Sequence, residues 1–223
     1  MSDKKWSLEG ELMKMTGAPT LHRAITISGL LEVAENEPIQ LRIERDWWRS
    51  GAETYSLIFD VETQSAQRTA IMKACVAWGS LSLAATFEQW FTRRATLRAA
   101  GVQVPDLYCR DNATLVEEYI PFDFYEHVKQ SPDRHSLLFA AGRAAALISK
   151  TGFTPLSLVD LRTRGSDVVF IDFGQDLGDP DANTRSGLLN LSEVISNLEH
   201  REINLSDAEL RMLESGFAAV PEG

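Results

Sequence analysis

Two charged side chains in this sequence occur in or after apolar strands, at places where they could do chemistry. Asp172 follows the apolar run VVFI and precedes Phe173 and Gly174, which permit a turn. A carboxylate that leaves a strand in this way suits a Mg²⁺ ion held by few protein ligands. The alternative is a loop aspartate that caps its own turn.

The second charged side chain is Lys73, in the run AIMKA. Side chains alternate along a strand, so Ile71 and Cys75 share the face of Lys73. An ammonium is unfavourable to bury in apolar surroundings unless it meets an anion, so an anionic partner is expected. The alternative is an edge-strand lysine whose ammonium reaches water.

Three strands with period-two alternation must position Lys73. They are expected from Ile39 (IQLRIERDWW), over Thr54–Glu62 (TYSLIFDVE) and over residues 68–78 (RTAIMKACVAW). This alternation, with β-branched and aromatic residues, predicts an antiparallel meander.

From Ser82 the apolar spacing becomes helical, and Gly101 ends this helix. One stripe of the helix carries its large apolar residues, which are Leu83, Phe87, Trp90, Phe91 and Leu97. The basic run TRRATLR (residues 92–98) indicates a solvated helix face, with an anion site as the alternative.

The rest of the chain is mainly helical. Its expected elements are two strands around RDNA, a helix from Ser131 to Gly152, a hairpin turning at RGSD, and helices over residues 183–200 and 206–220. Ser206 and Glu209 have the spacing of a capping box. A sheet followed mainly by helices predicts an α+β fold with two lobes and a boundary near residues 121–124.

This order of elements, with AIMKA on the third strand and VVFIDFG at the end of a later hairpin, resembles the protein-kinase-like superfamily. Its aminoglycoside and choline phosphotransferase branch and the small atypical kinases of the KEOPS complex are the most similar. The resemblance covers residues 39–198. It implies a bilobal protein-kinase-like fold, with an antiparallel-sheet N-lobe over residues 1–120, a mainly helical C-lobe over residues 121–223, and ATP and Mg²⁺ as ligands.

The resemblance assigns the phosphates and the metal to charged residues. Lys73 would meet the α- and β-phosphates of ATP, and Asp172 would hold magnesium. Glu88 would be the partner of Lys73, because it is the only acidic residue between Lys73 and Asp106. A surface glutamate is the alternative for Glu88.

Backbone groups would hold the rest of the nucleotide. Gly51, in the short loop GAE, would lie over the phosphates through backbone amides. The Glu118 carbonyl and the Ile120 amide would contact adenine. Glu117 and Glu118 side by side are also consistent with a solvated pair at a turn.

The catalytic loop departs from the family pattern. That pattern has an aspartate that orients the attacking hydroxyl and, five residues later, an asparagine that holds metal. Residues 149–164 contain one carboxylate, Asp160, and no asparagine or histidine. Asp160 would be the catalytic base if the loop is shortened; the alternative is an exposed pair of Asp160 with Arg162 on one strand.

Composition and net charge limit the classes of partner that the chain is expected to bind. The chain has 223 residues and a net charge of -10, which disfavours nucleic acid. No apolar run approaches the roughly 20 residues of a membrane span, and the N-terminal residues lack the apolar segment of a secretory signal. Cys75 and Cys109 have no metal-ligand spacing, so reduced thiols in a cytoplasmic protein are expected.

Three functions follow from these observations. The first is an ATP-dependent phosphotransferase acting on a hydroxyl of a small molecule or a protein. The second is a catalytically impaired pseudokinase that regulates a protein partner. The third is a KEOPS-like accessory role in tRNA modification, which the GAE loop favours and the acidic charge disfavours.

Overall fold

The chain divides into two compact units. A computed structural model describes residues 40–49, 54–62, 67–75, 83–110, 114–155, 160–174, 177–178 and 186–221. One unit is residues 1–88 with 106–119, and the other is residues 89–105 with 120–223. The α+β class predicted from the sequence is confirmed.

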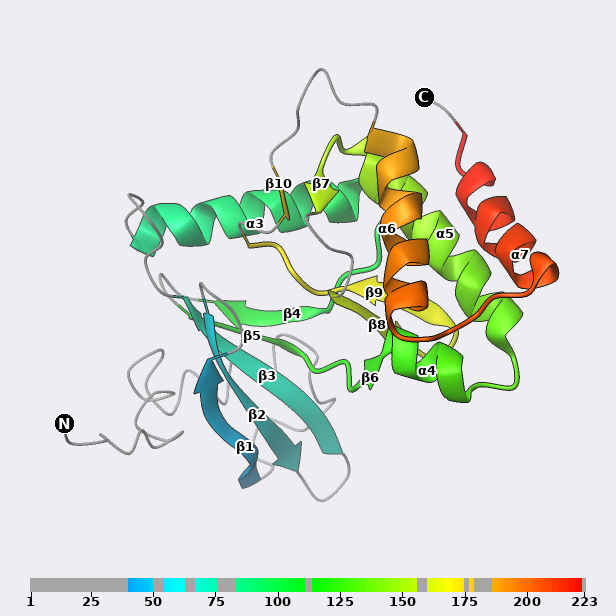
Figure 1. The fold of residues 1–223 in the computed structure, drawn as a ribbon. Helices are drawn as coiled ribbons and strands as arrows, with labels where there is room; N and C mark the ends of the chain where they lie inside the picture. The colour runs from blue at the N-terminus through cyan, green and yellow to red at the C-terminus, as the bar shows by residue number, and fades with distance from the viewer. Residues whose placement is uncertain are drawn as a thin grey trace. The chain divides into compact units, whose positions relative to one another are not determined.

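The first unit is built on a five-stranded antiparallel sheet with the strand order β1-β2-β3-β5-β4 (Figure 1). The strands are β1 (Gln40–Arg49), β2 (Thr54–Glu62), β3 (Gln67–Cys75), β4 (Leu107–Arg110) and β5 (Thr114–Glu118). Strands form here because apolar and polar residues alternate along each run. The meander expected from that alternation is confirmed.

The two faces of this sheet differ in chemistry. On one face the buried residues of β2, β3 and β5 are all apolar, and they are Leu57, Phe59, Val61, Ala70, Met72 and Val116. The opposite face is also buried but carries polar and charged groups, which are Ser56, Asp60, Lys73 and Glu117 beside Ile58 and Leu115. Charge is therefore buried on one side of the sheet.

The second unit is mainly helical. Its helices are α3 (Leu83–Ala99, from residue 89 onward), α4 (Phe124–Gln130), α5 (Arg134–Lys150), α6 (Ser186–His200) and α7 (Asp207–Ala218). Strands β6 (Phe122–Asp123), β8 (Leu161–Arg164) and β9 (Asp167–Phe170) form a three-stranded sheet, and β7 (Thr154–Pro155) pairs with β10 (Leu177–Gly178). No described helix is both long enough and apolar enough to cross a membrane.

Local signals in the sequence set several element ends. Gly101 ends α3 at φ +91°, and Gly165 turns the β8–β9 hairpin at φ +61°, both in the left-handed region that glycine tolerates. Helix α7 begins with the predicted capping box, in which Ser206 and Glu209 bond each other's backbone amides. Helix α5 starts later than predicted, because the side chain of Asp133 is its N-cap.

The sequence placed residues 89–105 in the first lobe, whereas they fall in the second compact unit. The solvated basic face expected over residues 92–98 holds for Arg98, which is exposed, and is wrong for the other two arginines of α3 in that run. Arg93 and Arg94 are buried. Arg93 donates to the carbonyl of Gly174 and Arg94 to the carbonyl of Pro105. Because Arg93 bonds the chain after β9, this part of α3 belongs to the second unit.

Helices α5 and α7 approach each other closely at two glycines. A Cβ atom on Gly142 would lie 1.9 Å from the carbonyl oxygen of Leu213, and one on Gly216 would lie 2.0 Å from that of Phe139. Backbone thus meets backbone at this contact, where α5 packs against α7 (Figure 1). A side chain at either position has no flexible neighbour that could move aside.

We therefore expect Gly142→Ala and Gly216→Ala each to lower the free energy of unfolding by at least about 2 kcal/mol, because overpacking outweighs the helical preference of alanine. Urea denaturation measures this change. Ser215→Ala, at the exposed neighbour in α7, is the control and should stay within about 0.5 kcal/mol of the parent. Parental stability of Gly216→Ala would contradict the close contact.

Candidate functional site

Lys73 lies in the interior of the five-stranded sheet. Strand β3 lies between β2 and β5, with Lys73 opposite Ser56 on one side and Leu115 on the other. Its side chain is 11% exposed. The alternative of an edge-strand lysine that reaches water is therefore wrong. Because the ammonium is buried, it requires the anionic partner that was expected.

That partner is Glu117 on β5. The Nζ atom of Lys73 lies 2.7 Å from Oε1 of Glu117, whose side chain is 1% exposed. Glu117 is opposite Ile71, so it is the diagonal neighbour of Lys73 on the same face. The expectation that Glu88 is the only carboxylate available to Lys73 is wrong, because β5 supplies one.

Glu88 is on the surface, which was the alternative for it. Its side chain is 71% exposed, and its Oε1 atom lies 3.9 Å from Nη1 of Arg110. Ion pairs with this exposure contribute little to stability. Glu118, by contrast with its neighbour Glu117, points to the other face, where its Oε2 atom accepts from the amide of Asp106 at 3.2 Å.

Glu117 retains one oxygen that could accept a hydrogen bond. Within the described parts of the chain, its Oε2 atom is buried and has no hydrogen-bond partner. A buried acceptor without a partner is unfavourable, and a buried ion pair is maintained only if its geometry is good. The ion pair with Lys73 is therefore a contact that offsets the burial of this carboxylate inside the sheet unit.

Asp60 is a second buried carboxylate on the same face. Its oxygens accept from Arg42 Nη2 at 2.7 Å, Thr69 Oγ1 at 2.7 Å and Gln67 Nε2 at 3.2 Å. Burial alone raises the pKa of Asp60, but these hydrogen bonds and the charge of Arg42 outweigh it and hold the pKa below its ordinary value. Asp60 is therefore ionised near neutral pH.

In the second unit, Asp160 and Asp172 flank one end of the β8–β9 hairpin. Leu161 is opposite Phe170 in this hairpin, and the amide of Ile171 donates to the carbonyl of Asp160 at 3.2 Å. Asp160 thus immediately precedes β8, and Asp172 follows β9 by two residues. Both carboxylates are half-buried.

The loop that carries Asp172 is anchored at the next two residues. Phe173 is fully buried, with its ring 4.8 Å from that of Trp90 at 86° and 5.8 Å from that of Phe170 at 81°. Arg93 bonds the carbonyl of Gly174. These contacts fix the backbone on one side of Asp172.

Asp172 itself makes the contact expected for a turn-capping aspartate. Its Oδ1 atom accepts from the amide of Gly174 at 2.8 Å. This bond uses one lone pair and is compatible with metal binding through other lone pairs of the carboxylate. In the described segments, no three His, Cys, Asp or Glu side chains form a metal-binding group. A Mg²⁺ ion at Asp172 would therefore take most of its ligands from water and phosphate.

The surroundings of Asp160 are charged. Arg162 has its ion pair with Asp123, at 3.7 Å, and Arg201 lies 3.2 Å from the same carboxylate. Tyr125 is fully buried, and the Arg201 guanidinium lies 4.6 Å from its ring centroid. Burial raises the pKa of Tyr125; the charge of Arg201 opposes this, and the charges of Asp123 and Asp160 act in the same direction as burial. The proposed role of Asp160 as a base stays a prediction.

The remaining predicted site residues are those expected to contact the nucleotide through their backbone groups. Gly51 lies outside the described residues. Glu118 and Ile120 stand on either side of Tyr119, where the first unit ends, and Ile120 is buried. Their contacts with adenine stay predictions.

The sequence interpretation missed Glu117 and Arg93 for different reasons. Glu117 stands beside a second glutamate, so the pair resembled a solvated turn. Only the register of β5 against β3 places Glu117 on the face of Lys73. Arg93 lies in a basic run, and helical periodicity gives no sign that an arginine bonds a distant carbonyl.

Comparison with known proteins adds no assignment. No model of a known protein family matches the chain, and no curated protein matches it at a significant level.

The buried ion pair can be tested by a double-mutant cycle. Lys73→Met and Glu117→Leu should each lower the free energy of unfolding by about 3 to 5 kcal/mol, because each leaves a buried charge without its partner. The double variant should recover most of this loss, since apolar residues of similar volume replace both charges. Chemical denaturation of the four proteins gives the coupling energy.

The control cycle uses Glu88→Ala and Arg110→Ala, whose exposed side chains should couple by less than about 1 kcal/mol. A coupling between Lys73 and Glu117 no larger than in the control would contradict a buried ion pair.

Proposed function

We propose that this chain is a kinase-like protein that binds ATP and Mg²⁺, with slow or absent phosphoryl transfer. The observation that carries the proposal is the buried ammonium of Lys73, which lies on the inner third strand of an antiparallel sheet and is held by the carboxylate of Glu117 on β5. Kinases hold the lysine of their third strand with a glutamate while it contacts the α- and β-phosphates. Here Glu117, which lies on strand β5, would have the role of that glutamate.

The order of elements supports the proposal. Along the chain, helix α3 follows the third strand and precedes the fourth. In kinases, too, a helix follows the strand that carries the lysine. A hairpin, β8–β9, later delivers Asp172 to a loop that continues with Phe173 and Gly174. A bilobal kinase-like fold is part of the proposal.

Asp172 would hold the Mg²⁺ ion. Its loop is fixed through the burial of Phe173 and the bond from Arg93 to Gly174, so the carboxylate has a defined position. Magnesium held there would supply positive charge that offsets the charge of the phosphates. In this role Asp172 needs few protein partners, because the nucleotide supplies further oxygens.

Slow or absent transfer is proposed because the catalytic loop lacks the usual residues. Residues 149–164 contain Asp160 and no other carboxylate, asparagine or histidine. Loss of a general base lowers a rate by about 10²- to 10⁴-fold. A protein of this kind would act as a regulatory binding module with a nucleotide-dependent state.

A divergent phosphotransferase is the second candidate, and the position of Asp160 favours it. Asp160 and Asp172 leave the same end of one hairpin. Carboxylate oxygens are suitable ligands for Mg²⁺, so an ion near this end of the hairpin could take a second protein oxygen from Asp160. Asp160 would then be a second metal ligand, in place of the base role that the sequence assigned to it.

Nucleotide binding is tested by thermal denaturation with ATP and Mg²⁺. At about 1 mM ATP and an affinity of about 10 μM, ligand binding adds about 2.7 kcal/mol of stability. The parent should show this stabilisation and Asp172→Ala should lose it. Asp167→Ala, at the opposite end of the same hairpin, is the matched control and should respond like the parent.

If ATP and Mg²⁺ leave the melting temperature of the parent unchanged, both proposed functions, the nucleotide-binding module and the phosphotransferase, are contradicted. A response of Asp172→Ala equal to that of the parent would remove the metal role of Asp172 alone.

The two roles of Asp160 make different predictions for ATP turnover. As a metal ligand, Asp160→Asn should keep activity within about 10-fold of the parent, because an amide oxygen still binds cations, and Asp160→Ala should lose more. As a base, both variants should lose about 10²-fold or more. Release of phosphate from ATP, measured against Mg²⁺ concentration, separates these results. A parent without measurable turnover supports the binding module.

A further inference from the structure

A pocket in the second unit lies away from Asp160 and Asp172, at the opposite end of the hairpin. Four segments line it: the chain after α3, one face of α5, the turn between β8 and β9 with the start of β9, and α7. Its volume is about 500 Å³. Pockets that bind small molecules are about 300 to 1,000 Å³, so this volume suits a small organic ligand.

The floor of the pocket is apolar. Ala140, Ala144 and Leu147 line it from α5, and Val168 lines it from β9. Ala144 and Val168 are buried. Two alanines, spaced four residues apart on the helix, leave room beside the larger side chains. An apolar body of a ligand would bury surface here.

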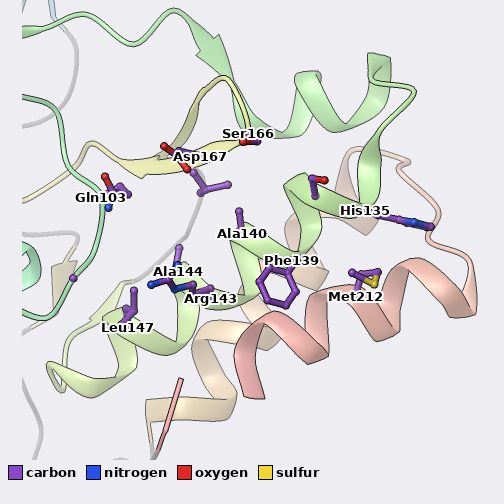
Figure 2. Close-up of a pocket in the computed structure, with 13 residues that line it drawn as sticks. Gln103, His135, Phe139, Ala140, Arg143, Ala144, Leu147, Ser166, Asp167 and Met212 are labelled. Carbon is purple, nitrogen blue, oxygen red and sulfur yellow. The ribbon is translucent and has the colours of Figure 1, made fainter. Parts of the chain in front are cut away.

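The rim of the pocket carries two charges of opposite sign. Arg143 lies on α5 and Asp167 begins β9, and both are exposed. Figure 2 shows Gln103 and Asp167 on one side of the pocket and Arg143 and Ala144 of α5 on the other. Neither Arg143 nor Asp167 takes part in an ion pair among the described residues. Both charges are thus available to a ligand.

We propose that this pocket binds a small zwitterion with an apolar body, such as a free apolar amino acid. The guanidinium of Arg143 would pair with the carboxylate of the ligand, since its planar fork matches two oxygens. The carboxylate of Asp167 would pair with the ammonium. Ala140, Ala144 and Val168 would contact the apolar part. This inference is independent of the proposed nucleotide binding.

The test uses three probes with the same phenylethyl body: L-phenylalanine, phenethylamine, which lacks the carboxylate, and 3-phenylpropionate, which lacks the ammonium. Amide chemical shifts of the full chain are followed by NMR. L-Phenylalanine should bind with a dissociation constant on the order of 1 to 10 mM, as expected for so small a ligand. Each analogue should bind about 5-fold more weakly or worse.

Two variants assign the charges. Arg143→Gln should abolish the preference for L-phenylalanine over phenethylamine and keep its preference over 3-phenylpropionate. Asp167→Asn should do the reverse. Lys150→Gln, at the exposed end of α5 and outside the pocket lining, is the control and should keep both preferences. Both pocket residues are exposed, so the variants should fold normally, and their amide spectra verify this.

Three results would overturn the proposal. The first is no saturable shift up to about 50 mM L-phenylalanine, well above the expected range. The second is saturable binding whose shifts lie outside the pocket lining. The third is retention of both preferences in both variants.

Discussion

Burial of charge within an antiparallel sheet is the constraint on which the first unit depends. Lys73 and Glu117 neutralise each other across β3 and β5, and Arg42 compensates Asp60 on the same face. A shift of one residue in the pairing of β3 would move Lys73 onto the face of Met72 and the other apolar residues. The ion pair therefore fixes the strand register as well as the position of the ammonium.

The second unit controls the position of its carboxylates by different means. The backbone beside Asp172 is held by the aromatic packing of Phe173 and by Arg93, a residue of α3 that is buried for this contact. The carboxylate itself stays half-buried. An anchored backbone with an accessible side chain is the arrangement that a metal ligand needs, because the ligand must be pre-positioned and still reach the ion.

Much of the fold could be predicted from the sequence because its signals are local. Alternation gave the strands, and Gly101 and the Ser206 capping box marked helix ends. Helix α4 was not predicted, since it is 7 residues long and too short for a periodic pattern.

The candidate site was less predictable because its contacts join distant segments. Burial of Lys73 followed from its neighbours, whereas the identity of its partner depended on how β3 pairs with β5. The buried state of Arg93 depended on a carbonyl that lies 81 residues away in the chain. Sequence patterns report which face a residue shares with its near neighbours, and they do not report which distant groups meet that face.

The contact between α5 and α7 places a joint requirement on two positions that lie 74 residues apart, from 142 to 216. Each glycine meets the backbone of the opposite helix, so neither substitution is relieved by a compensating change in a side chain across the contact. During evolution these two sites should therefore be lost or kept together. In divergent homologues, a co-inherited pair of glycines on these helices would be a marker of common ancestry that persists after the charged residues have changed.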